Sequence, residues 1–262
     1  MIPTVIATRP EGPSNSARRR MLGVKGEPLF YSDWLRAVFI HYEVVAGVLQ
    51  REVPFELDLH QGKAYISLVA FTMRDMRPRI GGSISALLFK PIATHGFLNV
   101  RTYVKHQGEP GIYFLAEWLS NPLSLMLGPP AFGLPYRFGR LDYRHEHEKG
   151  RLHGLVTERD QSARLEYISQ IDAGGAFHPC SAGSREEFLM ERYTAFTANQ
   201  SARRFFRIWH PPWVQSPIHI EVPDIGLLTN AWPWFKTARL VGANYSPGIR
   251  DVWMGRPQRI LT

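Results

Sequence analysis

The chain of 262 residues contains one cysteine, Cys180. A single thiol excludes an internal disulfide framework and fits a reducing compartment, so we expect a cytoplasmic protein. Long apolar runs are also missing, since none reaches the roughly 20 residues that a membrane-spanning helix needs. The segment Met1–Arg20 has no apolar core of the kind that a signal peptide carries. We therefore expect no signal peptide and no membrane association.

Familiar catalytic and cofactor-binding motifs are absent as well. No Gly-rich phosphate-binding fingerprint follows a predicted strand, and neither a G-x-S-x-G nucleophile elbow nor an H-E-x-x-H zinc motif occurs. Cys180 lies in His178-Pro179-Cys180, which matches no cysteine-nucleophile motif, so we interpret its thiol as inert. The sequence thus predicts no cofactor.

Lysine is scarce: six of the 31 basic residues are lysines, and the formal net charge of +8 comes mostly from arginines spread along the chain. This spread favours a generally basic surface, or scattered arginines for anionic ligands, over a dedicated nucleic-acid stripe. The exception is residues 1–28, which contain Arg18-Arg19-Arg20 together with Pro, Gly and Ser. We predict a flexible basic N-terminal tail over residues 1–28 and a single β-barrel domain over residues 29–262.

Apolar residues are plentiful enough for a large core, at 44% against 21% charged. Short β-branched and aromatic runs separated by turn signals, such as Lys63–Phe71, predict about eight to ten strands. Asn121-Pro122 predicts a helix that Gly128-Pro129-Pro130 ends, and a capping box at Ser184 predicts a helix that ends near Asn199. The pattern indicates a β-rich α+β fold, an antiparallel barrel or sandwich with short peripheral helices.

A hairpin predicted over Leu98–Trp118 is the stretch around which the fold is organised. Side chains alternate between the two faces of a strand, so Asn99, Arg101 and Tyr103 share one face and the opposite face is apolar. The polar face either meets solvent or lines a polar cavity, and we favour the cavity. Matching the apolar faces of the two arms sets these pairs: Leu98 with Trp118, Val104 with Ile112, Asn99 with Glu117, and Tyr103 with Tyr113.

This register places Arg101 diagonal to Glu117. A buried guanidinium needs an acidic partner or an anionic ligand, because an unpaired buried charge is very costly. Two interpretations follow and stay open here. Either Arg101 and Glu117 form an internal salt bridge that fixes the register, or Arg101 clamps a carboxylate or enolate while Tyr103 donates a hydrogen bond.

Other candidate residues lie further along the chain. Tyr136 follows Pro135 on the approach to a strand, and it either lines the cavity or packs in a turn. Arg192 lies in the predicted helix, where it either forms a surface ion pair or reaches the barrel mouth. His210 and His41 end predicted strands, where each is a candidate general acid or base or a structural histidine.

Three histidines form the best candidate metal site. His145 and His147 share a strand face, and the next arm of a predicted hairpin places His153 opposite His147. However, these residues lie among Arg, Glu and Lys at a hairpin tip, which is typical of a solvated face. We therefore assign no metal, and whether the three bind one stays open.

Seven short segments together resemble the landmarks of the YqjF-like bacterial proteins, the domain of unknown function 2071. Their order and spacing carry the resemblance, which covers roughly residues 30 to 256, about the whole chain beyond the tail. The segments are Asn99–Val104, Pro110–Phe114, Leu134–Tyr136, Thr157–Arg159, Glu191–Tyr193, His210–Trp213 and Tyr245–Gly248.

That family is distantly similar to the acetoacetate decarboxylase-like barrels, so the resemblance implies a cone-like antiparallel β-barrel with an internal cavity. Acetoacetate decarboxylase works through a lysine Schiff base, in which a neighbouring lysine keeps the nucleophilic amine free. This sequence has no adjacent lysine pair, and the stretch Leu134–Gly139 carries Tyr136 and Arg137 instead. The Schiff-base mechanism is therefore not expected, and only the cavity carries over.

Together these observations predict an internal cavity that binds a small organic acid or an enolisable metabolite. If the protein is an enzyme, we expect a lyase or hydrolase without a Schiff-base lysine; the alternatives are a non-catalytic binding or sensing barrel and a weak contact with nucleic acid or a partner through the tail. The oligomeric state stays open, a homo-oligomer included. The expected catalytic residues are Glu117 and Tyr103, and the expected ligand-binding residues are Arg101, Asn99, Tyr113, Tyr136, Arg192 and His210.

Overall fold

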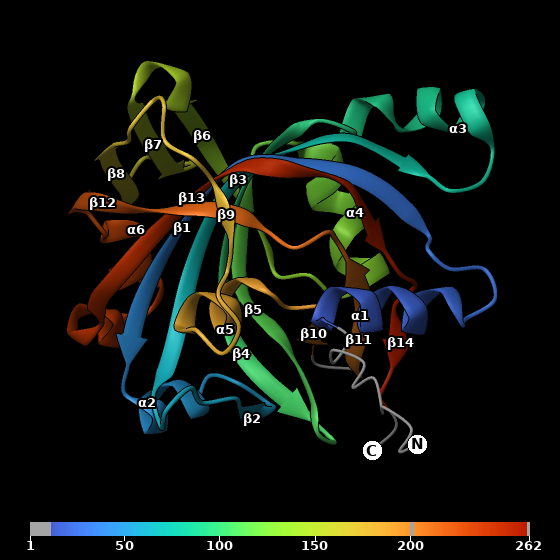
Figure 1. Ribbon diagram of the computed structural model, residues 1–262, viewed down its shortest axis with the longest axis horizontal. Helices are drawn as coiled ribbons and strands as arrows, with labels where there is room; N and C mark the ends of the chain where they lie inside the picture. Colours follow the sequence, from blue (N-terminus) through green and yellow to red (C-terminus); the bar gives the residue numbers. More distant parts are fainter. Residues whose placement is uncertain (1–11, 200–201, 261–262) are drawn as a thin grey trace, which may run out of the picture.

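The computed structural model describes residues 12–199 and 202–260. Strands dominate this part of the chain, and all of its helices are short (Figure 1). The strands are β1 (Phe30–Val44), β2 (Glu56–Leu57), β3 (Ala64–Pro78), β4 (His95–His106), β5 (Glu109–Leu119), β6 (Tyr136–Glu146), β7 (Arg151–Glu158), β8 (Arg164–Gln170), β9 (His178–Pro179), β10 (Thr194–Asn199), β11 (Ala202–Trp209), β12 (Val214–Asp224), β13 (Arg239–Met254) and β14 (Gln258–Arg259). The helices are α1 (Pro13–Leu22), α2 (Ala46–Gln50), α3 (Gly82–Phe89), η1 (Lys90–Ile92), α4 (Pro122–Phe132), η2 (His147–Lys149), α5 (Arg185–Met190), α6 (Gly226–Ala231) and η3 (Pro233–Thr237).

Nine strands close into a barrel. Hydrogen-bonded neighbours run β5-β6-β7-β8-β12-β13-β1-β3-β4, and β4 pairs with β5 to complete the ring. A second, smaller ring uses β10 and β11 to connect β5 to β13 on the other side. The strands β13, β1, β3, β4 and β5 belong to both rings, and we call them the shared sheet. The predicted β-rich barrel with short helices is confirmed. The pairs β5–β6 and β5–β10 are parallel, so the sheet is mixed rather than wholly antiparallel.

The two faces of the shared sheet carry two separate apolar cores. Side chains alternate along β1, so Val38 and Ile40 join one core while Ala37 and Phe39 join the other. The first core extends to β7, β8, β12 and α6, and the second to α5, β10 and β11. Figure 1 shows these two groups of elements on opposite sides of β1 and β3. This arrangement explains why residues 64–71 of β3 are buried on both faces.

The helix predicted after Ser184 is shorter than expected. Its cap is confirmed, because the Ser184 hydroxyl accepts a hydrogen bond from the Glu187 amide at 3.1 Å. The helix nevertheless ends at Met190, and Thr194–Asn199 forms β10, which pairs with β11 and β5. Strand pairing therefore prevails over the helical spacing of apolar residues in this segment. The Asn121 cap of α4 is also confirmed, although α4 continues past its two prolines to Phe132.

The predicted N-terminal tail is only partly described. Residues 1–11 lie outside the described residues. From Pro13 to Leu22 the chain forms α1, which buries Ala17 and Met21 against the barrel, and the Ser14 hydroxyl donates to the His210 carbonyl oxygen at 2.7 Å. For this stretch the prediction of a flexible tail is wrong, because three small or apolar side chains at helical spacing dock α1. No helix in the described part of the chain is long and apolar enough to cross a membrane.

The central hairpin is present with a changed register. Leu98 pairs with Trp118 and Asn99 pairs with Glu117, as predicted. A β-bulge after Val100 then shifts the pairing, because one extra residue on β5 opposes β4 there. Beyond the bulge the predicted pairs are wrong, and the observed ones are Arg101 with Phe114, Thr102 with Tyr113, Tyr103 with Ile112 and Val104 with Gly111.

Candidate functional site

A cavity of about 320 Å³ lies on the face of the shared sheet that carries the second core, and residues of β1, β3, β4, β5, α4 and β11 line it. Figure 1 shows α4 and β11 beside the shared sheet on that side. Its walls are mainly apolar and aromatic. The aromatic lining residues are Phe30, Trp34, Phe71, Phe89, Phe97, Phe114, Phe132, Tyr136, Phe206 and Trp213. The polar lining residues are His95, Asn99, Arg101, Glu117, Ser124, Arg192 and His210. A mostly apolar wall with a few polar groups is typical of a small-molecule site.

Arg101 lies at the polar end of this cavity and is buried. Its Nη2 donates to the Leu189 carbonyl oxygen at 3.0 Å, and Nε has no hydrogen-bond partner among the described residues. No ion pair within 4.0 Å joins it to Glu117, although both residues are described. The internal salt bridge is thus not formed. The guanidinium carries a charge that no carboxylate of the described chain neutralises by contact.

Glu117 is buried on β5, beside Asn99. Burial raises the pKa of the Glu117 carboxyl to about 8, and the charge of Arg101 opposes that rise only partly. The carboxyl is therefore mainly neutral at pH 7 and can donate a hydrogen bond. Its Oε2 has no partner within the described chain, and the same holds for Oδ1 of Asn99. Buried polar atoms without partners are rare in folded proteins, so their grouping here marks a place for a ligand or for water.

Tyr136 begins β6 and is the parallel neighbour of Glu117, whose amide donates to the Pro135 carbonyl oxygen at 3.1 Å. Burial and the nearby Glu117 charge raise the pKa of Tyr136 well above its usual range, so its hydroxyl stays a donor. A Cβ on Gly128 of α4 would come within 2.1 Å of the Tyr136 ring. Only glycine therefore allows α4 to pass so close, and this contact holds the ring against the cavity.

His210 and Arg192 also line the cavity, but their polar groups are already engaged. Burial lowers the pKa of His210 to about 4, and its Nδ1–H donates to the Pro211 carbonyl oxygen at 2.7 Å. Arg192 forms an ion pair with Asp58 at 2.7 Å, and its Nε donates to the Phe188 carbonyl oxygen at 2.7 Å. Arg192 lies after α5 rather than within a helix. We interpret its role as fixing the end of α5 beside the cavity.

Two predicted site residues do not line the cavity. The Tyr103 hydroxyl lies next to Arg101 and donates to the same Leu189 carbonyl oxygen, at 2.8 Å. It also contacts the Ser67 hydroxyl, which is bonded to Nδ1 of His41 at 2.7 Å. Tyr103 is therefore a supporting residue. Tyr113, predicted as ligand-binding, does not line the cavity either, because the bulge turns it to the opposite face of the sheet, where it packs against the first core.

Two polar lining residues were not predicted, namely Ser124 of α4 and His95 at the start of β4. Burial lowers the pKa of His95 to about 4, so the imidazole is neutral at pH 7, while the backbone of Ile92 opposes this shift. Neither ring nitrogen has a hydrogen bond of ordinary geometry in the described structure. The signal that could have found His95 is strand alternation, because it lies two alternate positions before Asn99, just outside the hairpin predicted from Leu98.

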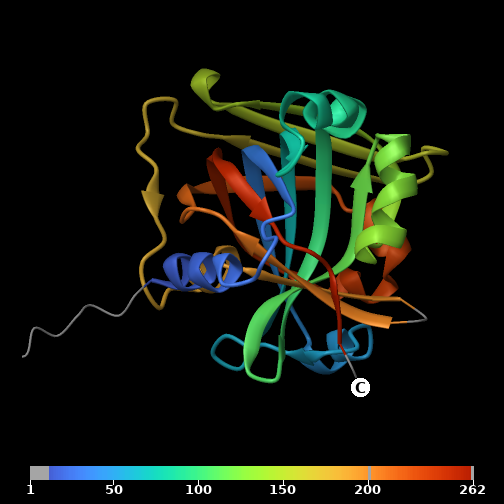
Figure 2. The ribbon, with the colours of Figure 1, turned by 90° about the vertical axis from the view of Figure 1, so that its right-hand side faces the viewer.

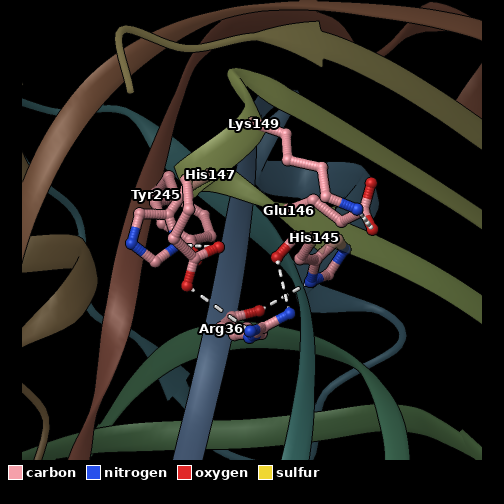
Figure 3. Close-up of polar contacts among 7 residues, drawn as sticks. Arg36, His145, Glu146, His147, Lys149 and Tyr245 are labelled. Atoms are coloured by element: carbon pink, nitrogen blue, oxygen red, sulfur yellow. Dashed lines mark hydrogen bonds and ion pairs between the residues drawn. The ribbon is translucent and has the colours of Figure 1, made fainter. Parts of the chain in front are cut away.

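The three histidines considered as metal ligands do not converge. His145 donates from Nδ1 to the Arg36 carbonyl oxygen at 2.6 Å, while His147 bonds the Tyr245 hydroxyl at 2.7 Å (Figure 3). His153 lies beside Glu166, at 3.3 Å. Within the described residues no group of three or more His, Cys, Asp or Glu side chains is arranged to hold a metal ion. The cluster in Figure 3 fixes the tip of the β6–β7 hairpin against β1 and β13.

Comparisons with known proteins agree with this architecture. The family DUF2071, described as an uncharacterized conserved protein, matches residues 31–249. The chain belongs to this family. It is also similar to the uncharacterized protein YqjF of Bacillus subtilis, with 28% identity over 212 residues that cover 76% of this chain and 79% of YqjF. The match confirms the resemblance found in the sequence.

Solved structures with the same fold are acetoacetate decarboxylase-like barrels. The acetoacetate decarboxylase of Legionella pneumophila has a TM-score of 0.60 and 14% identity, covering 89% of this chain and 87% of that enzyme. The enduracididine biosynthesis enzyme MppR, complexed with pyruvate, has a TM-score of 0.61 and 12% identity, covering 90% of this chain and 91% of that enzyme. At these identities the likeness establishes the fold alone.

Lysine is missing from the cavity wall. All six lysines of the chain are described, and none of them lines the cavity. Lys105, the lysine of the central hairpin, forms an ion pair with Glu56 at 2.8 Å instead. The cavity therefore offers no side-chain amine to a carbonyl substrate.

Proposed function

We propose that the cavity binds a small organic acid whose carboxylate lies against Arg101. The observation that carries this proposal is the buried guanidinium that lacks a contacting carboxylate and leaves its Nε unpaired. A carboxylate ligand supplies both the charge and the acceptor, because it matches the planar donors of arginine. The pyruvate complex of MppR supports the idea that this fold can enclose a small keto acid.

Three neighbouring groups complete the proposed site. The neutral carboxyl of Glu117 and the Tyr136 hydroxyl offer hydrogen bonds, and Asn99 leaves Oδ1 free to accept one. A bound anion favours the neutral form of Glu117 further, since like charges in a buried site repel. Binding and protonation of Glu117 are thus coupled, with a tighter complex below the pKa of this carboxyl than above it.

The same arrangement supports a catalytic version of the proposal. A carboxyl whose pKa is raised to about 8 is poised near neutral pH, where proton transfer is most effective. We propose Glu117 as the general acid or base of a lyase or hydrolase that acts on an enolisable acid without forming a Schiff base. In the non-catalytic alternative, the same residues bind the acid and no turnover follows.

A contact with nucleic acid or a partner through the arginines of α1 has less support. The Arg18 guanidinium stacks on Trp209 and Trp253, with 5.4 and 5.2 Å to the ring centroids. Arg20 lies 3.6 Å from Glu109. Both side chains contact other residues of the protein, so α1 does not present Arg18 and Arg20 as a free basic arm.

Isothermal titration calorimetry with small carboxylates and 2-keto acids tests the binding proposal. Arg101→Gln removes the charge and keeps several donors, and we expect affinity to fall about 10- to 100-fold, the loss typical of a charge-assisted hydrogen bond. Arg137→Gln is the matched control, because Arg137 stacks on Trp118 and does not line the cavity. Equal affinities in the wild type and Arg101→Gln would refute the proposal.

A further inference from the structure

The polar and apolar groups of the cavity are separated along the strands. Alternate residues of β4 face the cavity in the order His95, Phe97, Asn99 and Arg101. The register pairs them across β3 with Met73, Phe71, Val69 and Ser67 in turn. We call each such pair of facing residues a level. The two levels that contain Asn99 and Arg101 are polar and lie together at one end of the cavity. The two levels that contain His95 and Phe97 are apolar, apart from the neutral imidazole of His95.

The cavity is also long in this direction. Arg101 lies six positions after His95, which corresponds to about 20 Å along an extended strand. The polar end is closed by α5, whose Leu189 carbonyl oxygen accepts from Arg101. The apolar end reaches α3, η1 and α4, which contribute Phe89, Ile92 and Leu127 to its wall.

The surface around the apolar end is itself apolar. Leu127 of α4 lines the cavity and is 49% exposed, so the cavity reaches the surface there. Nearby, α3 exposes three large apolar side chains, Ile84, Leu87 and Leu88, beside the exposed Ser83. Figure 2 shows α3 and α4 at the same end of β4, and the Asn121 amide before α4 donates to the Pro91 carbonyl oxygen of η1 at 2.7 Å.

From this segregation we propose that the ligand is a carboxylic acid with an extended apolar body, an alkyl chain or an aryl-alkyl group. Its carboxylate lies against Arg101, and its body runs along β3 and β4 past Phe97 and Phe71 toward α4. This inference rests on the proposed function of the cavity and deepens it. An acid of two to four carbons fills only the polar levels, and it leaves the apolar walls without a partner.

A homologous series of straight-chain acids from acetate to decanoate tests the inference, with binding measured by calorimetry on the full chain. Each methylene that is buried improves affinity about fourfold, so we expect a steady rise until the chain reaches α4. Primary alcohols of the same lengths serve as ligands without the carboxylate, and each should bind at least tenfold more weakly than its acid.

A substitution at the exposed end of the cavity tests the contribution of the apolar body to affinity separately from that of the carboxylate. Leu127→Asp places a negative charge at the apolar end, and we expect the longest acids to lose affinity at least tenfold while butyrate is unaffected. Met126→Asp is the matched control, since Met126 is adjacent, 64% exposed and outside the cavity wall. Both sites lie on the helix surface, so neither variant disturbs the core.

The outcomes distinguish the inference from the proposed function. Affinity that depends on Arg101 but not on chain length overturns the inference and leaves the proposed function intact. Equal loss of long and short acids in Leu127→Asp has the same meaning. Absence of carboxylate binding, or alcohols that bind as well as acids, overturns both.

Discussion

The two faces of the shared sheet differ in how they treat buried polar groups. On the filled face, the face of the first core, His145 donates to the Arg36 carbonyl oxygen and bonds the Tyr167 hydroxyl at 2.7 Å. On the cavity face, Asn99, Arg101 and Glu117 each keep a buried polar atom without a partner. An unsatisfied buried polar atom costs roughly 1–3 kcal/mol. The cavity face thus holds a satisfied network around Tyr103, Ser67 and His41, and beside it a group of open polar atoms that a ligand can complete.

One atom of the filled face departs from this pattern. Trp118 Nε1 is buried without a hydrogen-bond partner, although the ring itself packs under Arg137 at 5.1 Å. Trp118 Nε1 is a single unpaired atom among satisfied neighbours, whereas the unpaired atoms of Asn99, Arg101 and Glu117 lie together at adjacent positions of β4 and β5. Grouping, rather than the mere presence of an unpaired atom, distinguishes the candidate site.

The largest change in stability is expected when a large side chain is removed from the core of the filled face. Trp118 is fully buried, so Trp118→Ala should lower the free energy of unfolding by about 3–5 kcal/mol, through lost burial and a new cavity. Phe97→Ala on the cavity face should cost less than about 3 kcal/mol, because Phe97 already borders empty space. Urea denaturation measures both. Equal costs would mean that the two faces are packed alike.

A second comparison removes a polar side chain from each face. His145→Leu leaves the Tyr167 hydroxyl and the Arg36 carbonyl oxygen without their partner, so it should destabilise by about 1–3 kcal/mol. Arg101→Met removes a buried charge without a contacting carboxylate, so the free energy of unfolding should stay equal or rise by up to about 2 kcal/mol. Ligand binding should be lost only in Arg101→Met. Destabilisation by more than about 2 kcal/mol in Arg101→Met would show that its bond to Leu189 is mainly structural.

Much of the fold could be predicted from local signals. The caps at Asn121 and Ser184 and the paired start of the central hairpin are properties of neighbouring residues, so the sequence reveals them. The bulge after Val100 could not be predicted, because the alternation of apolar residues gives equal support to a regular register. That single extra residue moved Tyr113 from the expected site to the opposite face.

The candidate site could be predicted only in part, for a related reason. Arg101, Asn99 and Glu117 lie on one hairpin, so strand alternation grouped them correctly. Phe132, Phe206 and Trp213 reach the same cavity from α4, from β11 and from the segment before β12, and no short-range pattern connects them. The helical spacing of Phe188 and Phe196 also resembled one continuous helix, although pairing with β5 and β11 makes the second part a strand.

A pH-dependent effect follows from Glu117. Its pKa is raised to about 8 in the folded protein, whereas an unfolded glutamate ionises near 4.5. Between these values the unfolded chain has lost the proton and the folded chain has kept it, so this group makes stability fall as pH rises. The slope approaches about 1.4 kcal/mol per pH unit.

Comparison with Glu117→Gln isolates that slope. The buried histidines His41, His95 and His210 have lowered pKa values and act in the opposite direction, with stability that is lost as pH falls below about 6.5. They are present in both proteins and cancel in the difference. The stability of the wild type relative to Glu117→Gln should therefore decrease from pH 5 to pH 8 in urea titrations. A flat difference would place the pKa of Glu117 near its ordinary value.

The smallest expected effects are on ligand affinity, and they distinguish two tyrosines that were both predicted to bind the ligand. Tyr136 lines the cavity beside Glu117, and Tyr113 packs on the filled face. Tyr136→Phe removes one neutral hydrogen bond to the ligand, so affinity for a carboxylate should fall about threefold to tenfold. Tyr113→Phe should change affinity by less than about twofold, because its ring lies across the sheet from the ligand. Calorimetry with the same acid measures both. A larger loss of affinity in Tyr113→Phe would mean that β4 and β5 keep the regular register, with Tyr113 beside Tyr103 on the cavity face. The assignment of Tyr113 and Tyr136 to opposite faces of the shared sheet would then be wrong.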